Sequence, residues 1–281
     1  MWSFQKPVCA VVVYLALCLA WPAQAGPDFI EGMCNGEAGS DPSSACRVSG
    51  GGGGLVMSIT GKINGGGAGL GAPDFEDMYV ILITDPEGFS ATTVGPATGF
   101  DTQLWLFRAD ELDPTSDGLG LLANDDSSAA DDASMMGSMS DDGTGIAITM
   151  PGLYYLAVSG GAGLGVPGDG RFPVAGGLPI FDLISPTEVS GPDGAGGMSV
   201  VDGWAGKGEL GSYTIAIEGV TFLEPLCPWD CEATVDGGVG ITDFLALLGT
   251  WAVVGASCDF DGGGVGITDF LELLGHWGPC P

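Results

Sequence analysis

Seven short apolar runs, each separated from the next by clusters of Gly, Pro, Asp and Ser, most constrain the fold of this chain. The runs are rich in β-branched and aromatic residues and show no helical periodicity. Strands without intervening helices favour an antiparallel β-sandwich or jelly roll. The sequence therefore predicts a mainly β domain over residues 55–224, with the Gly-rich inserts 160–177 and 191–197 as loops. The predicted strands are residues 55–63, 78–84, 89–94, 102–108, 145–150, 152–159 and 213–220.

The first 25 residues have the pattern of a secretory signal peptide. A single positive charge, Lys6, precedes an apolar run over residues 8–21, and the sequence Ala-Gln-Ala at 23–25 fits the small-x-small rule for cleavage. The run is shorter than the roughly 20 residues of a membrane-spanning helix. We therefore expect export, cleavage after Ala25, no membrane insertion after cleavage, and a secreted or cell-surface location.

Charge and cysteine content narrow the class of protein further. The chain carries 36 acidic but only 6 basic residues, a formal net charge of −30. Such a surface repels nucleic acid and anionic membranes and attracts divalent cations. In an exported chain the six cysteines after residue 25 are expected to form disulfides, whose connectivity the sequence leaves open. They are Cys34, Cys46, Cys227, Cys231, Cys258 and Cys280.

Residues 26–54 differ from the predicted strands that follow. They contain Cys34 and Cys46 and end in the run Gly50–Gly54, which is typical of a flexible spacer. We expect an irregular segment here, closed by a disulfide, with ordered structure beginning at Leu55.

Catalytic motifs are missing from the sequence. It has one histidine, His276, and contains neither G-x-S-x-G nor H-E-x-x-H. We therefore expect no enzyme. Four aromatic residues offer a sugar-stacking platform as one interpretation and a buried core as the favoured one. They are Trp105, Trp204, Tyr154 and Tyr155.

Five segments of the β domain resemble the bacterial pre-peptidase C-terminal domain family. In chain order they are DFEDMYVILI (74–83), DTQLWLFR (101–108), LGLLANDD (119–126), PGLYYLAVS (151–159) and GSYTIAIEG (211–219). The resemblance implies a secreted β-sandwich module that accompanies an enzyme or surface protein, in a family where some members bind calcium or extracellular polymers. The acidic pairs at 125–126, 131–132 and 141–142 offer a calcium site at the rim of the sandwich. Their spacing fits no known loop geometry, so solvated side chains are the favoured interpretation.

A tandem repeat occupies the C-terminal part of the chain. Residues 237–251 read GGVGITDFLALLGTW and residues 263–277 read GGVGITDFLELLGHW, so 13 of 15 positions agree. Each copy predicts a short helix with one apolar face, and two such faces can bury each other. Cysteines would staple a module too small to rely on its core alone. The predicted faces are Phe244, Leu245, Leu248 and Trp251 in one copy and Phe270, Leu271, Leu274 and Trp277 in the other.

The segment before each helix has some features of an EF-hand loop. Such a loop needs oxygen ligands at positions 1, 3, 5 and 12 and Gly at position 6. Counting back from Asp243 gives Glu232, Thr234 and Asp236, then Gly237, with the carbonyl of Gly238 at position 7. In the second copy, counting back from Asp269 gives Cys258, Phe260 and Gly262, which offer no carboxylate. With Asp259 and Asp261 at positions 1 and 3, that loop is one residue short. We expect Ca²⁺ in the first copy and a weak or distorted site in the second; a helix pair without an ion is the alternative.

Closure of the loop by Asp rather than Glu, followed by ITDFLALLGTW, resembles the loop-helix repeat of type I dockerins. The resemblance implies that residues 227–281 form a dockerin-like module that docks to a cohesin-like or other extracellular protein module. It also implies that the partner contacts loop positions 10 and 11 and the following helix. Packing of Ile241 and Ile267 between the helices is the alternative. The implied partner-binding residues are Ile241, Thr242, Leu245, Ile267, Thr268 and Leu271.

These expectations combine into one functional hypothesis. The chain is expected to be a secreted, non-catalytic, calcium-binding structural or interaction protein whose tail docks it to an extracellular partner. The alternative is a carbohydrate-binding module or glycoside hydrolase component of an extracellular polysaccharide-degrading assembly, with polysaccharide as a further partner.

Overall fold

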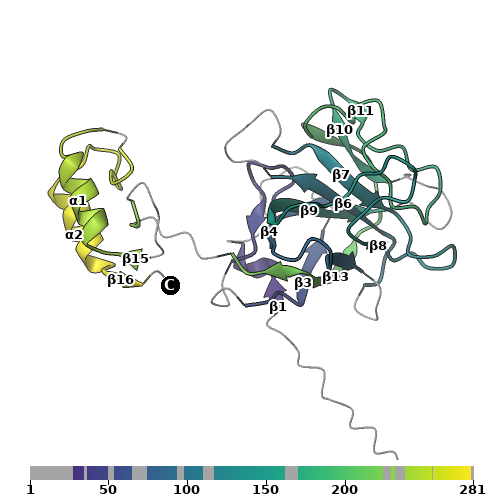
Figure 1. Ribbon diagram of the computed structural model, residues 1–281, viewed down its shortest axis with the longest axis horizontal. Coiled ribbons are helices and arrows are strands. Elements are labelled where there is room, and N and C mark those ends of the chain that lie inside the picture. The colour runs from purple at the N-terminus through teal and green to yellow at the C-terminus, as the bar shows by residue number, and fades with distance from the viewer. Residues whose placement is uncertain are drawn as a thin grey trace, which may run out of the picture.

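The computed structural model describes residues 28–34, 37–49, 54–64, 75–93, 98–109, 117–161, 170–223, 229–231, 238–254 and 256–279 (Figure 1). It is mainly β with two short α-helices, as the sequence predicts. The first strands are β1 (Asp28–Ile30), β2 (Cys46–Arg47), β3 (Ser58–Ile63), β4 (Glu76–Ile83), β5 (Ser90–Thr92), β6 (Thr102–Arg108), β7 (Gly120–Asn124) and β8 (Met135–Met136). The later strands are β9 (Gly152–Gly160), β10 (Arg171–Ala175), β11 (Leu178–Pro179), β12 (Gly203–Gly206), β13 (Gly211–Glu218), β14 (Val220–Thr221), β15 (Gly238–Val239) and β16 (Gly278–Pro279). The helices are the 3-10 helix η1 (Glu31–Met33), α1 (Ile241–Gly249) and α2 (Ile267–Gly275).

Two large sheets form the β domain. The first has the strand order β1-β3-β13-β5-β8, and the second has the order β14-β4-β9-β6-β7 with β2 beside β4. The named strands pair in antiparallel fashion except for β1 with β3 and β2 with β4. The two sheets bury a common apolar core, to which each contributes fully buried side chains. Examples are Ile59 and Ile215 from the first sheet and Ile81, Leu104 and Leu156 from the second.

The second sheet is covered on its outer face as well. A second cluster joins Trp105 and Phe107 of β6 to Phe181, and a three-stranded sheet of order β11-β10-β12 belongs to this layer. Arg171 of β10 donates two hydrogen bonds to the Glu76 carboxylate of β4, at 2.7 and 3.1 Å. Burial on both faces explains why β4 and β9 read as continuous apolar runs, whereas β13 alternates between buried and solvent-facing residues. The domain is therefore a sandwich with a third layer on one face.

Three predictions about the β domain are wrong. Ordered structure begins before Leu55, because β1 pairs with β3 and both Phe29 and Val48 are buried. Such short edge strands leave no periodic pattern in the sequence. The run 145–150 forms only an isolated bridge between Ala147 and Met139. The insert 160–177, predicted to be a loop, contains β10, whose strand character is masked by Pro173 and the surrounding glycines.

The C-terminal repeat forms a helix pair with its own small core. Leu247 of α1 and Leu273 of α2 are fully buried, and the Phe244 and Phe270 rings lie 5.7 Å apart. The strands β15 and β16 join the start of the first repeat to the end of the second. Among the described residues, no helix is long and apolar enough to cross a membrane.

Two disulfides confirm the expected pairing for four of the six cysteines. Cys34 bonds to Cys46 in the N-terminal segment, and Cys231 bonds to Cys258 in the helix pair. Cys227, Cys280 and the predicted signal peptide lie outside the described residues.

Candidate functional site

Each helix of the repeat begins with the same Gly-to-Asp contact. The backbone N–H of Gly240 donates to Oδ2 of Asp243, and that of Gly266 donates to Oδ2 of Asp269, both at 2.8 Å. The other oxygen of each carboxylate accepts from the preceding loop, at 2.7 Å in both copies. The loop donor is Cys231 for Asp243 and Phe260 for Asp269. Both aspartates are buried, so each one caps a helix and fixes the loop before it.

The second copy brings three carboxylates together. Oxygens of Asp259, Asp261 and Asp269 all lie within 4.8 Å of one another. This is the register in which Asp259 and Asp261 open the loop and Asp269 closes it. Burial alone would raise the pKa of Asp269, but backbone N–H groups, first those of Gly266 and Phe260, outweigh it and hold that pKa below its usual value.

This donor set fits a hard cation such as calcium, because all its side-chain ligands are carboxylate oxygens. Backbone N–H groups already occupy part of the set: Gly264 donates to Asp259 at 3.1 Å and Gly263 donates to Asp261 at 2.7 Å.

The first copy is described only in part. Asp243 closes its loop, and Gly238 pairs with Pro279 across β15 and β16. The remaining predicted ligands, Glu232, Thr234 and Asp236, lie outside the described residues.

Only part of the predicted apolar face of each helix is buried between the two helices. Phe244 and Phe270 meet between the helices, together with Leu247 and Leu273. The other predicted members point to solvent, which corrects the prediction of a single buried face. They are Leu245 (58% exposed), Leu248 (47%), Trp251 (46%), Leu271 (61%), Leu274 (45%) and Trp277 (49%).

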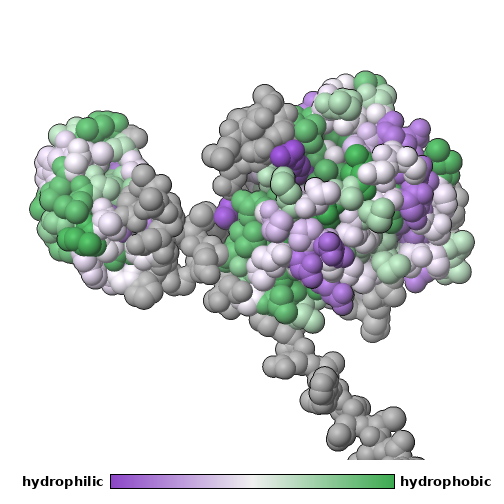
Figure 2. All heavy atoms as spheres, in the orientation of Figure 1, coloured by the Kyte–Doolittle hydropathy of each residue, from purple (hydrophilic) through white to green (hydrophobic). Residues whose placement is uncertain are grey.

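The residues predicted to contact a partner lie on this exposed stripe. Ile241 and Ile267 are 60% and 62% exposed, and Thr242 and Thr268 are exposed as well. The alternative that the two isoleucines pack between the helices is therefore wrong. Figure 2 shows hydrophobic residues gathered on the surface of the helix pair. Contiguous exposed apolar surface of this kind is typical of an interaction site.

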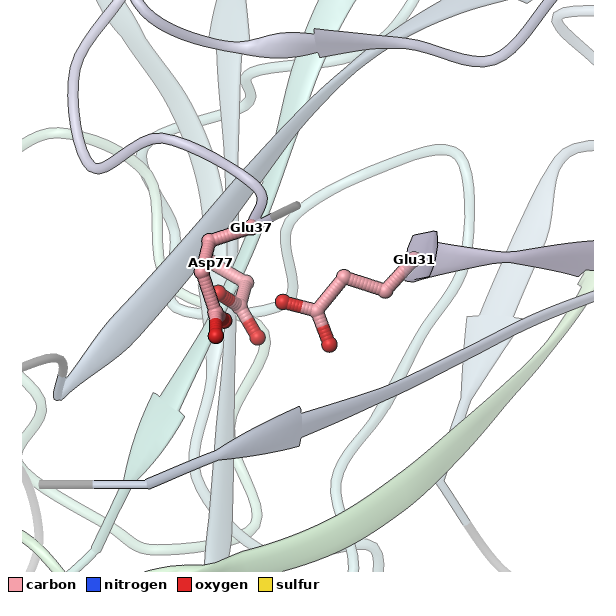
Figure 3. Close-up of side chains that lie close together, drawn as sticks. All are labelled: Glu31, Glu37 and Asp77. Carbon is pink, nitrogen blue, oxygen red and sulfur yellow. The ribbon is translucent and has the colours of Figure 1, made fainter. Parts of the chain in front are cut away.

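A cluster of three acidic side chains lies near the start of the β domain. Glu31 of η1, Glu37 and Asp77 of β4 direct their carboxylates toward one another (Figure 3). The Glu31 carboxylate accepts backbone N–H groups from Ala38 at 3.3 Å and Lys62 at 2.8 Å. Burial nevertheless raises the pKa of Glu31 to about 7.

Asp77 of this cluster belongs to a buried hydrogen-bond network. It accepts a hydrogen bond from the Tyr213 hydroxyl at 2.6 Å, and the Tyr213 and Tyr79 hydroxyl oxygens lie 2.5 Å apart. Burial raises the pKa of Tyr213 well above its usual value. The network therefore ties β4 to β13 across the sandwich core.

A second acidic cluster comprises Asp101, Asp125 and Asp126, all of them buried. Burial raises the pKa of Asp126 to about 6, and the negative charges of Asp132 and Asp131 add to the shift. The interpretation of Asp125 and Asp126 as solvated side chains is therefore wrong. The sequence indicates Asp125 and Asp126, which follow β7, but not Asp101. Asp101 lies beside them only because β6 pairs with β7.

The third acidic pair of this region has a local structural role instead. Asp141 accepts the backbone N–H of Val189 at 2.8 Å, and Asp142 accepts those of Thr144 and Gly191 at 2.8 and 2.6 Å. These two side chains therefore stabilise the turn at residues 141–144 and connect it to residues 189–191.

The aromatic residues weighed for sugar stacking belong to the core. Trp105, Tyr154 and Tyr155 are buried, and the Trp105 indole donates to Ser159 Oγ at 2.8 Å. Trp204 packs against Trp105, with ring centroids 6.3 Å apart. His276 ends α2 and stacks on Trp229.

Comparison with protein-family models, with curated proteins and with solved structures finds no match for this chain.

Proposed function

We propose that this chain is an extracellular, non-catalytic interaction protein, and that its helix pair is a calcium-dependent, dockerin-like docking module for a cohesin-like protein module. The observation that carries the proposal is the pair of matching apolar stripes that α1 and α2 leave exposed. The carboxylate set of Asp259, Asp261 and Asp269 supports calcium as the ion that orders the loop beside one stripe. The jelly-roll connectivity of the β domain stays a prediction.

A docking surface of this kind has a physical rationale. The small core of the helix pair is complete without Leu245 and Leu271, so their exposure does nothing for the fold. Burying exposed leucines against a partner contributes about 1.5 to 3 kcal/mol each. Since the two stripes are nearly identical in sequence, either copy offers a partner the same contacts. No described feature favours the polysaccharide alternative, because the aromatic residues considered for it lie in the core.

The test measures capture of the full chain by a panel of purified cohesin-like modules in calcium and in chelator. We expect Leu245→Ala and Leu271→Ala each to reduce capture only partly, because the other copy remains, and the double variant to abolish it. Thermal unfolding should change little, since both side chains are more than half exposed. Met198→Ala, at an exposed position of the β domain, is the control.

Two results would contradict the proposal. One is the absence of capture by any module of the panel in calcium. The other is a double variant that unfolds at a lower temperature but is captured as well as the wild type, which would make the stripe part of the core.

A further inference from the structure

We propose that Asp101, Asp125 and Asp126 form a calcium site inside the β domain, at the edge where β6 begins and β7 ends. The site is separate from the helix pair and does not depend on its docking function.

Strand pairing brings the three residues together. β6 and β7 are antiparallel neighbours, with Leu104 opposite Asn124. Asp101 directly precedes β6, while Asp125 and Asp126 directly follow β7. The start of one strand and the end of its antiparallel neighbour lie at the same edge of a sheet, so the three aspartates converge.

Burial makes this convergence costly without a cation. Asp101, Asp125 and Asp126 are only 3%, 3% and 2% exposed, and oxygens of the three carboxylates lie within 4.8 Å of one another. Like charges held this close and away from water destabilise a fold unless an opposite charge compensates them.

Asp126 provides the observation that points to a ligand. Its backbone N–H donates to the Pro186 carbonyl, and its own carbonyl accepts from Asn124 Nδ2. Within the described part of the chain its carboxylate has neither a hydrogen-bond donor nor a basic partner. The buried Glu31 carboxylate, by contrast, accepts two backbone N–H groups. A buried carboxylate that has no donor and is directed at two others needs a positively charged partner. A metal ion would supply that charge.

The donor chemistry favours calcium over other ions. All three side chains offer carboxylate oxygen, the ligand of hard cations. Calcium takes roughly six to eight oxygen ligands in flexible geometry, whereas magnesium keeps several waters and is bound by only one or two carboxylates. Three carboxylates that converge on one point therefore suit calcium better than magnesium.

An acidic pocket adjoins the cluster. Asp131, Asp132 and Glu209 line it. Oε2 of Glu209 accepts the backbone N–H of Asp101 at 3.1 Å, and the Asp132 carbonyl accepts that of Thr102 at 2.9 Å, so the wall of the pocket contacts the start of β6. Carboxylates around a pocket raise the local concentration of cations beside the cluster.

The test compares full-length wild type with Asp126→Asn, using Asp182→Asn as an exposed, matched control. Titration calorimetry counts the bound calcium ions, and hydrogen exchange locates calcium-induced protection. We expect Asp126→Asn to lose one ion per chain and the protection over residues 98–103 and 124–134. In chelator it should be at least as stable as wild type, because a buried charge is gone. In calcium, Asp126→Asn should be less stable than wild type, because it no longer gains stability from the bound ion. The control should behave as wild type.

A second variant perturbs the proposed site without replacing any of its three aspartates. A Cβ added at Gly161 would lie 2.3 Å from Oδ1 of Asp101, so Gly161→Ala displaces that carboxylate. We expect it to weaken the same ion. Unchanged stoichiometry and protection in both variants would overturn the proposal, as would an equal loss of stability for Asp126→Asn with and without calcium. Asp259→Asn, which alters only the helix pair, should leave the protection at 98–103 intact, so this site and the docking module fail or succeed separately.

Discussion

Glu31 shows how burial sets the charge state of a single side chain. Desolvation raises the pKa of its carboxyl group from 4.5 to about 7, although two backbone N–H groups favour the charged form. The folded chain therefore binds a proton more tightly than the unfolded chain. Between pH 4.5 and about 7 the folded state holds this proton and the unfolded state has released it. The free energy of unfolding consequently falls as the pH rises through this window.

Replacing Glu31 with Gln removes the titrating group. We expect the pH-dependent part of the unfolding free energy over this window to shrink by about 2 kcal/mol. Gln also loses one backbone hydrogen bond, but that cost does not depend on pH. Urea unfolding at a series of pH values in chelator measures the slope, with Glu218→Gln at an exposed position of β13 as the control. Equal slopes in wild type and Glu31→Gln would rule out a buried proton on this residue.

At the residue scale, sequence patterns identify the acidic pairs but not how deeply they are buried or which residues lie beside them. Asp125 and Asp126 stand out beside a predicted strand, whereas Asp101 has no local signal that links it to them. Burial of Glu31 is equally invisible, because it depends on a parallel pairing of β1 with β3 that no periodicity predicts.

At the scale of elements, the short helix predicted for each copy of the repeat is present, as α1 and α2. The buried face does not follow. Phe244 and Leu247 form one apolar stripe, and Ile241, Leu245 and Leu248 form another at the same helical spacing. Only the position of the second helix decides between them.

The cap of α2 gives a test at this scale. In chelator, Asp269→Asn should lower the stability of α2 by about 1 kcal/mol, because the amide keeps one acceptor oxygen where the carboxylate satisfies two backbone N–H groups. Hydrogen exchange of α2 amides in the full chain measures the effect. Glu272→Gln, which retains an acceptor for the Trp229 indole, should leave protection unchanged. Equal protection in Asp269→Asn and wild type would contradict a role of the carboxylate in stabilising the helix.

For the molecule as a whole, a mainly β fold is predictable from the strand runs, but the third layer is not. Its short strands β10, β11 and β12 lie in Gly-rich and Pro-containing sequence that reads as loop. The apolar outward side of β4, β6 and β9 is the indirect signal, because strands that are apolar on both faces need two covering layers.

The third layer should therefore contribute to global stability. Phe181 is buried against Trp105 and Phe107, with ring centroids 5.6 and 6.1 Å away. We expect Phe181→Ala to lower the unfolding free energy by about 3 kcal/mol in a single transition. Urea unfolding followed by tryptophan fluorescence measures this. Leu178→Ala, at a position 50% exposed, is the control with little expected change. An unchanged midpoint for Phe181→Ala would mean that the layer folds independently of the sheet beneath it.

The central sheet also governs when the domain can form during synthesis. It pairs β4 with β9, and its two faces are covered by β13 on one side and by the β10 to β12 layer on the other. Neither covering layer is complete until β12 and β13, which lie beyond residue 200, have left the ribosome. Until then the most apolar strands of the chain are only partly covered, which makes them the segments most prone to aggregate and the ones that a holding chaperone would bind.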